Sequence, residues 1–367
     1  MTFRLARFAG AAAGLRTSPA RRWYSKTSDP LRILFCGSDD FSCRSLRALH
    51  EEKKRNPALI ESMEVMVRPP KRTGRGYKQL REVPCQTLAE RLGLKTHQRD
   101  TFREWELPEG TNLIVAVSFG LFVPPRILGS AKYGGLNVHP SFLPDLRGPA
   151  PIHHALLRRD EYIGVSLQTL DSRKFDHGTI LAQTPPHTIP IRPEDTLSTL
   201  IEAAGDVGAE MLVQGLRDGL HVAPHEDVGS QLEGKELRHA PKVTKGDSRI
   251  DWVSWDAEDF RRRTLVSGSV WSMVLAPSVG PKRAIFRGVK PVPREAVRGK
   301  YHVLFSEEAG VEVRVGKEST AAFVVLRDGS WVSVESVLVE GKAEQPAAFA
   351  LKPFLVDPLL DSPSWDA

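Results

Sequence analysis

Cysteine is scarce in this chain, which has three among its 367 residues: Cys36, Cys43 and Cys85. Because the number is odd and no two form a C-x-x-C pair, we expect neither a disulfide framework nor a zinc site, and a reducing compartment fits best. Long hydrophobic runs are missing as well. None approaches the ~20 residues that a membrane-spanning helix needs, so no membrane partner is expected.

The first 28 residues contain no aspartate or glutamate. Leu5, Phe8, Ala12 and Leu15 are spaced by three or four residues, as on one face of a helix. The basic residues of this segment are Arg4, Arg7, Arg16, Arg21, Arg22 and Lys26. An arginine-rich, acid-free, amphipathic leader is typical of a mitochondrial transit peptide, which predicts location in the mitochondrial matrix. The alternative is a disordered basic tail.

What is present indicates a globular protein of two domains. Hydrophobic residues make up 41% of the chain, enough for a sizeable core, and the length suits two domains of ordinary size. The formal net charge is +6, with no internal repeat and no low-complexity tract. This charge favours an anionic partner such as nucleic acid, although a solvated basic face has the same composition.

The order of expected elements predicts an α/β fold followed by a smaller all-β part. The stretch "LRILFCGSDDF" is typical of strand, tight turn and helix, and 113–117 is a continuously apolar strand of the kind buried in parallel sheets. Over 29–222 we predict a doubly wound, Rossmann-like parallel sheet. A polar linker follows at 223–249. Regularly spaced short strands then predict a small, OB-like β-barrel over 250–367.

Two polar side chains stand where an expected strand ends, in "GLNVHPSFLPDLRGPAP". Residues i and i+2 of a strand face the same side, so Asn137 and His139 point to one place. Pro140 cannot continue a central strand, which puts both at the carboxyl end, where open parallel sheets bind ligands. An amide and an imidazole there can donate hydrogen bonds to a carbonyl-type oxygen. Alternatively, Asn137 caps the strand end and His139 is a satisfied structural histidine.

A carboxylate follows in "LDSRKFDHGTIL", where Asp176 occupies a glycine-containing loop after another expected strand. Beside His139 it would orient the imidazole and favour its charged form. Taken alone, Asp176 is a turn residue.

Six basic residues crowd the segment "VRPPKRTGRGYKQLR", which itself contains no acidic residue. Two glycines and two prolines predict a loop without regular structure. The six are Arg68, Lys71, Arg72, Arg75, Lys78 and Arg81. A second basic segment, 281–300, includes Lys282, Arg283 and Arg287. Either segment suits a nucleic acid, and the alternative for each is a solvated basic face.

These motifs together resemble those of the mitochondrial methionyl-tRNA formyltransferases, within the folate-dependent formyltransferase superfamily. "ILFCGSDDF" resembles a family strand followed by G-T-P-D-F, "TGRGYK" resembles P-A-G-R-G-K-K, and "SFGLFVP" is similar to A-Y-G-L-I-L-P. "NVHPSFLPDLRGPAPI" resembles N-V-H-x-S-L-L-P-x-x-R-G-A-A-P-I, the most specific motif, and "DSRIDW" is similar to A-R-I-D-W. The resemblance runs from about Leu31 to the C-terminus and weakens after about Leu220.

The resemblance implies roles for particular residues. Asn137, His139 and Asp176 match the family's catalytic trio. The donor would be 10-formyltetrahydrofolate, used as a co-substrate without a metal, and the acceptor the α-amine of initiator methionyl-tRNA in mitochondrial translation. The folate contacts implied are Ser141, Phe142, Leu143, Pro144, Phe119 and Gly120. The tRNA contacts expected are Arg68, Lys71, Arg72, Arg75, Lys78, Lys282, Arg283 and Arg287, in an enzyme that acts as a monomer.

The chain departs from the family pattern at three places. Phe142 replaces a usual leucine, Asp39 replaces a usual proline, and the segment from Asp171 to Asp176 is one residue longer than the bacterial D-x-G-x-D pattern. Two other functions remain open at this point. One is another folate-dependent N-formyltransferase, acting on a glycinamide ribotide or an amino sugar. The other is a matrix RNA-binding protein without catalysis.

Overall fold

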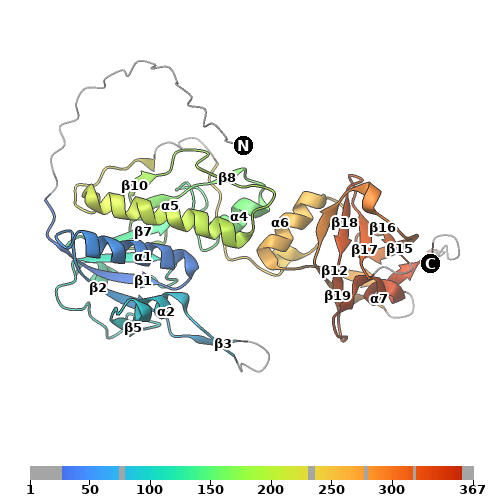
Figure 1. The fold of residues 1–367 in the computed structure, drawn as a ribbon, viewed down its shortest axis with the longest axis horizontal. Coiled ribbons are helices and arrows are strands. Elements are labelled where there is room, and N and C mark those ends of the chain that lie inside the picture. The colour runs from blue at the N-terminus through green and yellow to red at the C-terminus, as the bar shows by residue number, and fades with distance from the viewer. Residues whose placement is uncertain (1–26, 74–78, 230–235, 277–279, 317–319, 358–367) are drawn as a thin grey trace, which may run out of the picture.

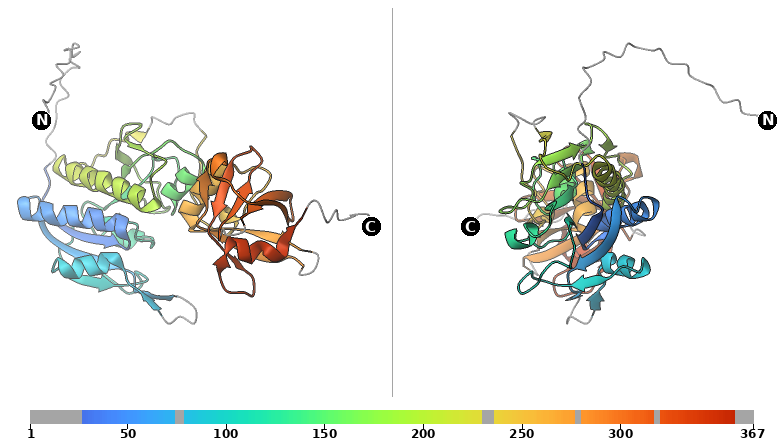
Figure 2. Two further views of the ribbon diagram at one scale, coloured as in Figure 1. Left: turned by 45° about the vertical axis from the view of Figure 1, so that its right-hand side comes forward. Right: turned by 90° about the vertical axis from the view of Figure 1, so that its left-hand side faces the viewer.

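The chain folds into two halves that can be told apart in Figures 1 and 2. A computed structural model describes residues 27–73, 79–229, 236–276, 280–316 and 320–357, so nearly all of the expected transit peptide lies outside the described residues. Among the described residues, the N-terminal half holds two apolar cores, one within 31–240 and one within 34–131, and the C-terminal half holds a third, from Ile250 to Phe354. Each half therefore has a hydrophobic core of its own.

The N-terminal half is built on a seven-stranded sheet in the order β10-β9-β7-β6-β1-β2-β5. The five strands from β7 to β5 are parallel, whereas β9 runs antiparallel to both β7 and β10. The strands are β1 Leu31–Gly37, β2 Ile60–Val67, β5 Thr96–Gln98, β6 Leu113–Val117, β7 Gly135–His139, β9 Ser166–Thr169 and β10 Ile180–Gln183. The predicted α/β fold is thus confirmed as a parallel-rich sheet with a mixed edge.

Helices cover the faces of this sheet, and α5 lies unusually close to it. A Cβ added at Gly208 would lie 2.7 Å from Val138 Cγ1, and one at Gly215 would lie 2.7 Å from Leu167 Cδ2. The glycines therefore let α5 approach β7 and β9, the strands beside the expected site. The helices are α1 Asp40–Arg55, α2 Pro84–Arg91, α3 Pro125–Leu128, α4 Pro151–Leu157 and α5 Leu197–Arg217.

The basic segment after β2 is more regular than its composition predicts. β3 (Lys71–Thr73) pairs antiparallel with β4 (Gln79–Arg81), and this hairpin stands out from the N-terminal half in Figure 1. The prediction of a loop without regular structure is wrong at these two strands, because glycine and proline lie in and before the turn and leave the arms free to pair. Arg75 and Lys78 lie outside the described residues.

The C-terminal half is an antiparallel, strand-rich region. Its helices are α6 Ala257–Ser267 and α7 Ala347–Leu351, with short 3-10 turns at Gly246–Ser248, Arg294–Ala296 and Lys352–Phe354. Its strands are β12 Val270–Leu275, β13 Lys282–Arg287, β14 Lys290–Val292, β15 Lys300–Ser306, β16 Gly310–Val315, β17 Ala322–Val325, β18 Trp331–Val334, β19 Ser336–Val339, β20 Gln345–Pro346 and β21 Leu355–Val356. Two small strands of the N-terminal half, β8 Tyr162–Ile163 and β11 Ile189–Pro190, pair with each other.

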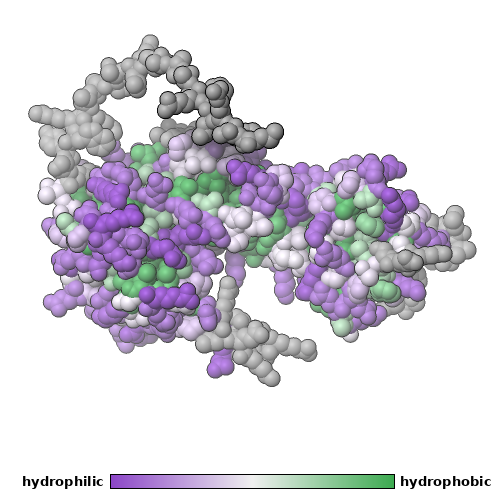
Figure 3. Space-filling view, in the orientation of Figure 1, coloured by the Kyte–Doolittle hydropathy of each residue, from purple (hydrophilic) through white to green (hydrophobic). Residues whose placement is uncertain are grey.

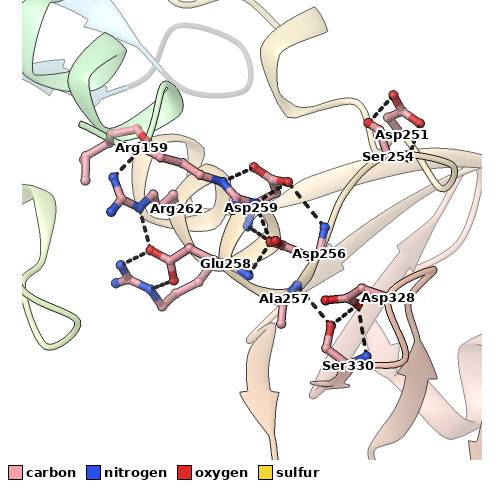
Figure 4. A network of polar contacts seen from close by, with 12 residues as sticks. Arg159, Asp251, Ser254, Asp256, Ala257, Glu258, Asp259, Arg262, Asp328 and Ser330 are labelled. Carbon is pink, nitrogen blue, oxygen red and sulfur yellow. Dashed lines mark hydrogen bonds and ion pairs between the residues drawn. The ribbon is translucent and has the colours of Figure 1, made fainter. Parts of the chain in front are cut away.

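Helix α6 joins the two halves through charged side chains, drawn in Figure 4. Arg159, which follows α4, donates to Asp259 Oδ1 at 3.0 Å and to Asp256 Oδ1 at 2.5 Å. Arg262 of α6 donates back to the carbonyl oxygen of Asp160 at 3.1 Å. These contacts hold the start of the C-terminal half against the loop after α4.

The surface of the molecule is polar over much of the face drawn in Figure 3, on both halves. Among the helices of the described ranges, none combines the length and the apolar character needed to cross a membrane.

Candidate active site

The structure brings Asn137 and His139 together at the carboxyl end of β7, as their spacing predicts. β7 lies between β6 and β9, and its last residue is His139. His139 is 6% exposed, so its imidazole is largely shielded from water. The strand thus presents an amide and an imidazole to the same region above the sheet edge.

Asp176 reaches this region from the loop between β9 and β10. Its backbone is left-handed, with φ of +56°, and its carbonyl oxygen accepts a hydrogen bond from Arg147 Nε at 2.7 Å. Gly178 follows against β9, where an added Cβ would lie only 1.7 Å from the carbonyl oxygen of Thr169. The loop is therefore fixed on both sides of Asp176, and its extra residue does not keep the carboxylate from the site.

The carboxylate of Asp176 collects donors from three segments. Asn137 Nδ2 donates to Oδ1 at 3.2 Å, and the backbone N–H of Gly148 donates to Oδ2 at 3.0 Å. Gln168 Nε2 also donates to Oδ1, at 3.3 Å. An ionised carboxylate only accepts hydrogen bonds, so it can satisfy all three of these donors at once.

The imidazole of His139 is oriented by two acceptors. Nε2 lies 3.0 Å from the carbonyl oxygen of Leu146, and Nδ1 lies 3.5 Å from Asp176 Oδ1. A carbonyl oxygen cannot donate, so Nε2 must carry a proton. Nδ1 is then the ring nitrogen that faces the carboxylate and the amide of Asn137.

Sequence reasoning missed Gln168, Gly148, Arg147 and Leu146, all of which orient the trio. Gln168 is 1% exposed and pairs in register with Asn137 across β7 and β9. Its Oε1 atom is buried without a hydrogen-bond partner. Only the alternation of "SLQTL" places Gln168 on the same face, and that signal has no meaning until the register with β7 is known.

The segment Ser141–Pro144, expected to contact folate, is held by hydrogen bonds between its backbone and the side chain of Ser166. Ser166 Oγ donates to the carbonyl oxygen of Ser141 at 2.7 Å and accepts from the N–H of Leu143 at 3.0 Å. The Leu143–Pro144 peptide bond is cis. Phe142 packs edge-on against Tyr162, with ring centroids 6.0 Å apart. The departure from leucine at position 142 thus fills space over Gly164, where no side chain would fit.

Ser141 and Phe142 line a cavity of about 530 Å³ together with Pro140, Leu146 and Tyr162. Asn137, His139 and Asp176 are not among its lining residues, and neither are Phe119 and Gly120. Phe119 is buried beside Phe102, whereas Gly120 is exposed with φ of +73°. The residues expected to contact folate therefore form two groups, at the end of β6 and after β7.

The expected tRNA contacts fall on two surfaces. Lys71 and Arg72 are exposed on the β3–β4 hairpin. In the C-terminal half, the guanidinium of Arg283 lies 4.2 Å from the ring centroid of Trp271, and Arg287 pairs with Glu344 at 2.6 Å. The ion pair partly neutralises Arg287, so Lys282 and Arg283 carry more of the free charge of β13.

Burial shifts the pKa of two titratable groups in the N-terminal half. Burial raises the pKa of Asp39, whose carboxylate caps α1 by accepting from the N–H of Ser42 at 3.0 Å. Burial lowers the pKa of His153 on α4. Within the described ranges, no group of three or more His, Cys, Asp or Glu side chains is placed to hold a metal ion.

Comparison with known proteins gives consistent matches. The formyl transferase family model matches residues 31–216. The chain is 35% identical over 261 residues to a mitochondrial methionyl-tRNA formyltransferase of Saccharomyces cerevisiae, covering 61% of this chain and 64% of that protein, which is less than two thirds of its length. It is 35% identical to the methionyl-tRNA formyltransferase of Cereibacter sphaeroides, covering 62% of this chain and 72% of that protein. The mitochondrial protein of Bos taurus is 31% identical, with 71% and 67% covered.

Solved structures with the same fold include HypX from Aquifex aeolicus. The TM-score is 0.51 at 20% identity, covering 89% of this chain and 48% of HypX. A HypX structure with tetrahydrofolic acid bound gives a TM-score of 0.50, covering 88% and 47%. The similarity extends over both halves of the chain.

Proposed function

The chain belongs to the formyl transferase family, and we propose that it transfers a formyl group from a folate-type donor to the amino group of methionyl-tRNA. The observation that carries this proposal is the meeting of Asn137, His139 and Asp176 at the carboxyl edge of the sheet, with Asn137 Nδ2 3.2 Å from Asp176 Oδ1. The relatives named above act on methionyl-tRNA, and the folate-bound HypX shares the fold. The finer assignment of the donor is 10-formyltetrahydrofolate.

The chemistry follows from where charge develops. The α-amine of the methionyl ester attacks as its neutral form, which is accessible because a free α-amine has a pKa of about 8. A carbon–nitrogen bond forms, and negative charge builds on the formyl oxygen. Asn137 Nδ2 and a proton on His139 Nδ1 would stabilise that charge, each worth ~3 kcal/mol in sites of this kind.

Proton transfer completes the reaction. The attacking nitrogen loses a proton as the bond from the formyl carbon to the folate nitrogen breaks, and that folate nitrogen gains one. His139 Nδ1 and Asp176 face each other at 3.5 Å and offer a path for this exchange, directly or through a water. The hydrogen bond from Nε2 to Leu146 keeps the ring in place throughout.

The division of the chain supports separate roles for its halves. The catalytic domain would span 29–222, the linker 223–249 and a tRNA-binding domain 250–367, with an enzyme that works as a monomer.

The C-terminal half would be a closed barrel. In the strand ladders, Arg287 lies opposite Ser336 and Lys290 lies opposite Ser333. The β13–β19 ladder therefore continues in the same register as the β14–β18 ladder. That shared ladder joins the two ends of the sheet and supports closure.

The site of action would be the mitochondrial matrix, where the product would serve translation initiation. Mitochondrial relatives from yeast and cattle support this location, as does the arginine-rich segment 1–28, although bacterial relatives are equally similar.

One assay tests the proposal against its rivals. The purified chain is incubated with 10-formyltetrahydrofolate and, separately, methionyl-tRNA, glycinamide ribotide and an amino-sugar nucleotide. Formyl transfer to methionyl-tRNA alone is the expected result. Transfer to either small acceptor in preference to tRNA would assign a different formyltransferase, and transfer to none would contradict catalysis.

A further inference from the structure

Arg68 is the first residue after β2, at the same sheet edge as the trio. It is half-buried, and its Nη1 lies 3.6 Å from the point that a Cβ on Gly120 would occupy. Gly120 belongs to the loop after β6, two strands away from β2 in the sheet. The side chain of Arg68 therefore extends over the end of β1 toward β6.

Among the described residues, the guanidinium of Arg68 has neither a hydrogen-bond partner nor an ion-pair partner. Its Nε atom is inaccessible to solvent and makes no hydrogen bond, and within the described part of the chain no ion pair involves Arg68. Other arginines near this edge are satisfied: Arg147 Nε donates to Asp176 at 2.7 Å, and Arg126 donates to the carbonyl oxygen of Trp105 at 2.9 Å. Holding a cation half-buried without an acceptor is costly, which points to an anion that arrives with a ligand.

The location of Arg68 is where an open α/β sheet binds ligands. From β1 the chain moves outward to β2 and β5, then returns to the other side of β1 as β6 and β7. The strand order reverses between β1 and β6, and a crevice forms outside the carboxyl ends at such a point. Ser38 Oγ, after β1, donates to the carbonyl oxygen of Phe119 at 3.3 Å and joins the two loops. Arg68 approaches this crevice beside Gly120.

We propose that Arg68 binds the phosphate that links the terminal nucleotide of the acceptor tRNA to its neighbour. This inference rests on the proposed function. The trio lies at β7, two strands from β1, which is about 10 Å at the usual spacing between strands. In a charged tRNA, the first anion along the chain from the α-amine is the 5′-phosphate of the terminal nucleotide. The carboxylates of folate lie at the far end of its glutamyl tail.

The hairpin that follows supports the acceptor over the donor. Lys71 and Arg72 are exposed, only three and four residues beyond Arg68. A tRNA 3′ end whose terminal phosphate binds Arg68 would therefore have further positive charge beside its preceding nucleotides. Arg68 would fix the terminal nucleotide, with the hairpin contacting the nucleotides before it. A guanidinium suits this task because its fork of donors matches two phosphate oxygens.

The test uses tRNA in which that one phosphate is replaced by an uncharged methylphosphonate. We expect kcat/KM of the parent enzyme to fall about tenfold with this tRNA, the size expected for hydrogen bonds to a charged group. Arg68→Met should lose about as much with unmodified tRNA and nothing more with the methylphosphonate. Arg68→Lys should keep part of the sensitivity. Arg99→Met, at an exposed arginine after β5, is the matched control for loss of one charge and should behave as the parent.

A second arm replaces the donor by 10-formyltetrahydropteroate, which lacks the glutamyl carboxylates. The parent and Arg68→Met should respond equally to this change. If Arg68→Met remains as sensitive to the methylphosphonate as the parent, or instead loses its response to the missing glutamate, the assignment to the tRNA phosphate is wrong. If the parent enzyme forms no formylmethionyl-tRNA at all, the proposed function has failed, which is a different outcome.

Discussion

Asp176 organises the candidate site through its hydrogen bonds. Its carboxylate accepts from Asn137, Gln168 and Gly148, and it lies 3.5 Å from His139 Nδ1. All four neighbours are donors or can become donors, so a negative charge at this position satisfies them together. An uncharged group of the same shape would satisfy fewer of them.

Asp176→Asn tests this arrangement. The amide keeps the shape but offers one acceptor oxygen, and its NH2 group must face a donor. We expect kcat to fall by about 100-fold and the pH–rate profile to change, because the group opposite His139 Nδ1 has lost its charge. The measurement is kcat against pH for both proteins. An unaltered profile would remove Asp176 from the proton path.

Gly178→Ala tests the loop that carries Asp176. An added Cβ would lie 1.7 Å from the carbonyl oxygen of Thr169, so either the loop or β9 must move. Overpacking of this kind costs about 1–3 kcal/mol of unfolding free energy, and the displaced carboxylate should lower kcat as well. Gly246→Ala is the control, since the atom nearest to its Cβ is Thr244 Oγ1 at 3.4 Å. Equal stability and activity in the two variants would mean that the loop adapts freely.

The site was only partly predictable at this scale. Asn137 and His139 are two positions apart, directly before a proline, and that local pattern fixes their shared face. Gln168 and Gly148 depend on the register of β9 against β7 and on the path of the loop after Pro140, which are set by tertiary packing. A buried donor that has no hydrogen-bond partner among the described residues, such as Arg68 Nε, cannot be recognised from a sequence.

Helices α1 and α5 pack side by side over the sheet that holds the site, as Figure 1 shows. Glu52 of α1 is 2% exposed and receives two hydrogen bonds from Arg217 of α5, at 2.9 and 2.5 Å. The pair connects the C-terminal ends of the two helices. Because α5 rests directly on β7 through Gly208, the position of this helix also bears on the site.

The Glu52–Arg217 pair predicts a pH dependence of stability. The Arg217 guanidinium holds the pKa of Glu52 below its ordinary value of 4.5. A lowered carboxyl pKa adds stability above the ordinary value, and that contribution is lost as pH falls through the lowered one. Glu52→Gln should therefore unfold at lower urea than the parent at pH 7, with a difference that shrinks below pH 4.5. A difference that is constant with pH would show that packing alone accounts for the change.

Prediction of elements succeeded where one local signal dominated. The apolar run 113–117 is the strand β6, and the strand, turn and helix expected for "LRILFCGSDDF" are β1, its following turn and the start of α1. It failed for the hairpin β3–β4, because proline and glycine mark a turn and say little about the arms beside it. The antiparallel direction of β9 also escaped, since strand direction depends on the connection between strands rather than on their composition.

At the scale of the whole molecule, positive charge is divided between two surfaces with different surroundings. The hairpin rises from the end of β2, next to the sheet edge that holds the trio. The charges of β13 lie on the C-terminal half, which α6 attaches to the N-terminal half through Arg159 (Figure 4). If a tRNA contacts both surfaces, β13 would bind it far from the trio, and the hairpin would position its acceptor end close to the trio.

This division predicts different effects for two sets of substitutions. Neutralising Lys282, Arg283 and Arg287 together should weaken tRNA binding and reduce the slope of log K against log salt by about two units, since Arg287 already pairs with Glu344.

Arg75→Ala, at a position outside the described residues, should lower turnover on tRNA and reduce discrimination between initiator and other acceptor stems, with little effect on the slope. If both sets change only the slope, the hairpin is one more electrostatic contact.

The most direct test of the account is the single-turnover rate of formyl transfer to methionyl-tRNA, measured for the parent, Asn137→Ala and His139→Ala alongside the tRNA dissociation constant. Asn137 and His139 lie at the end of β7 and contact Asp176, whereas the expected tRNA contacts of the described residues lie after β2, on the β3–β4 hairpin and on β13. We predict a fall in rate of about 100-fold or more for each variant, with tRNA affinity nearly unchanged. Rates within a few-fold of the parent would contradict the claim that these residues carry out the chemistry.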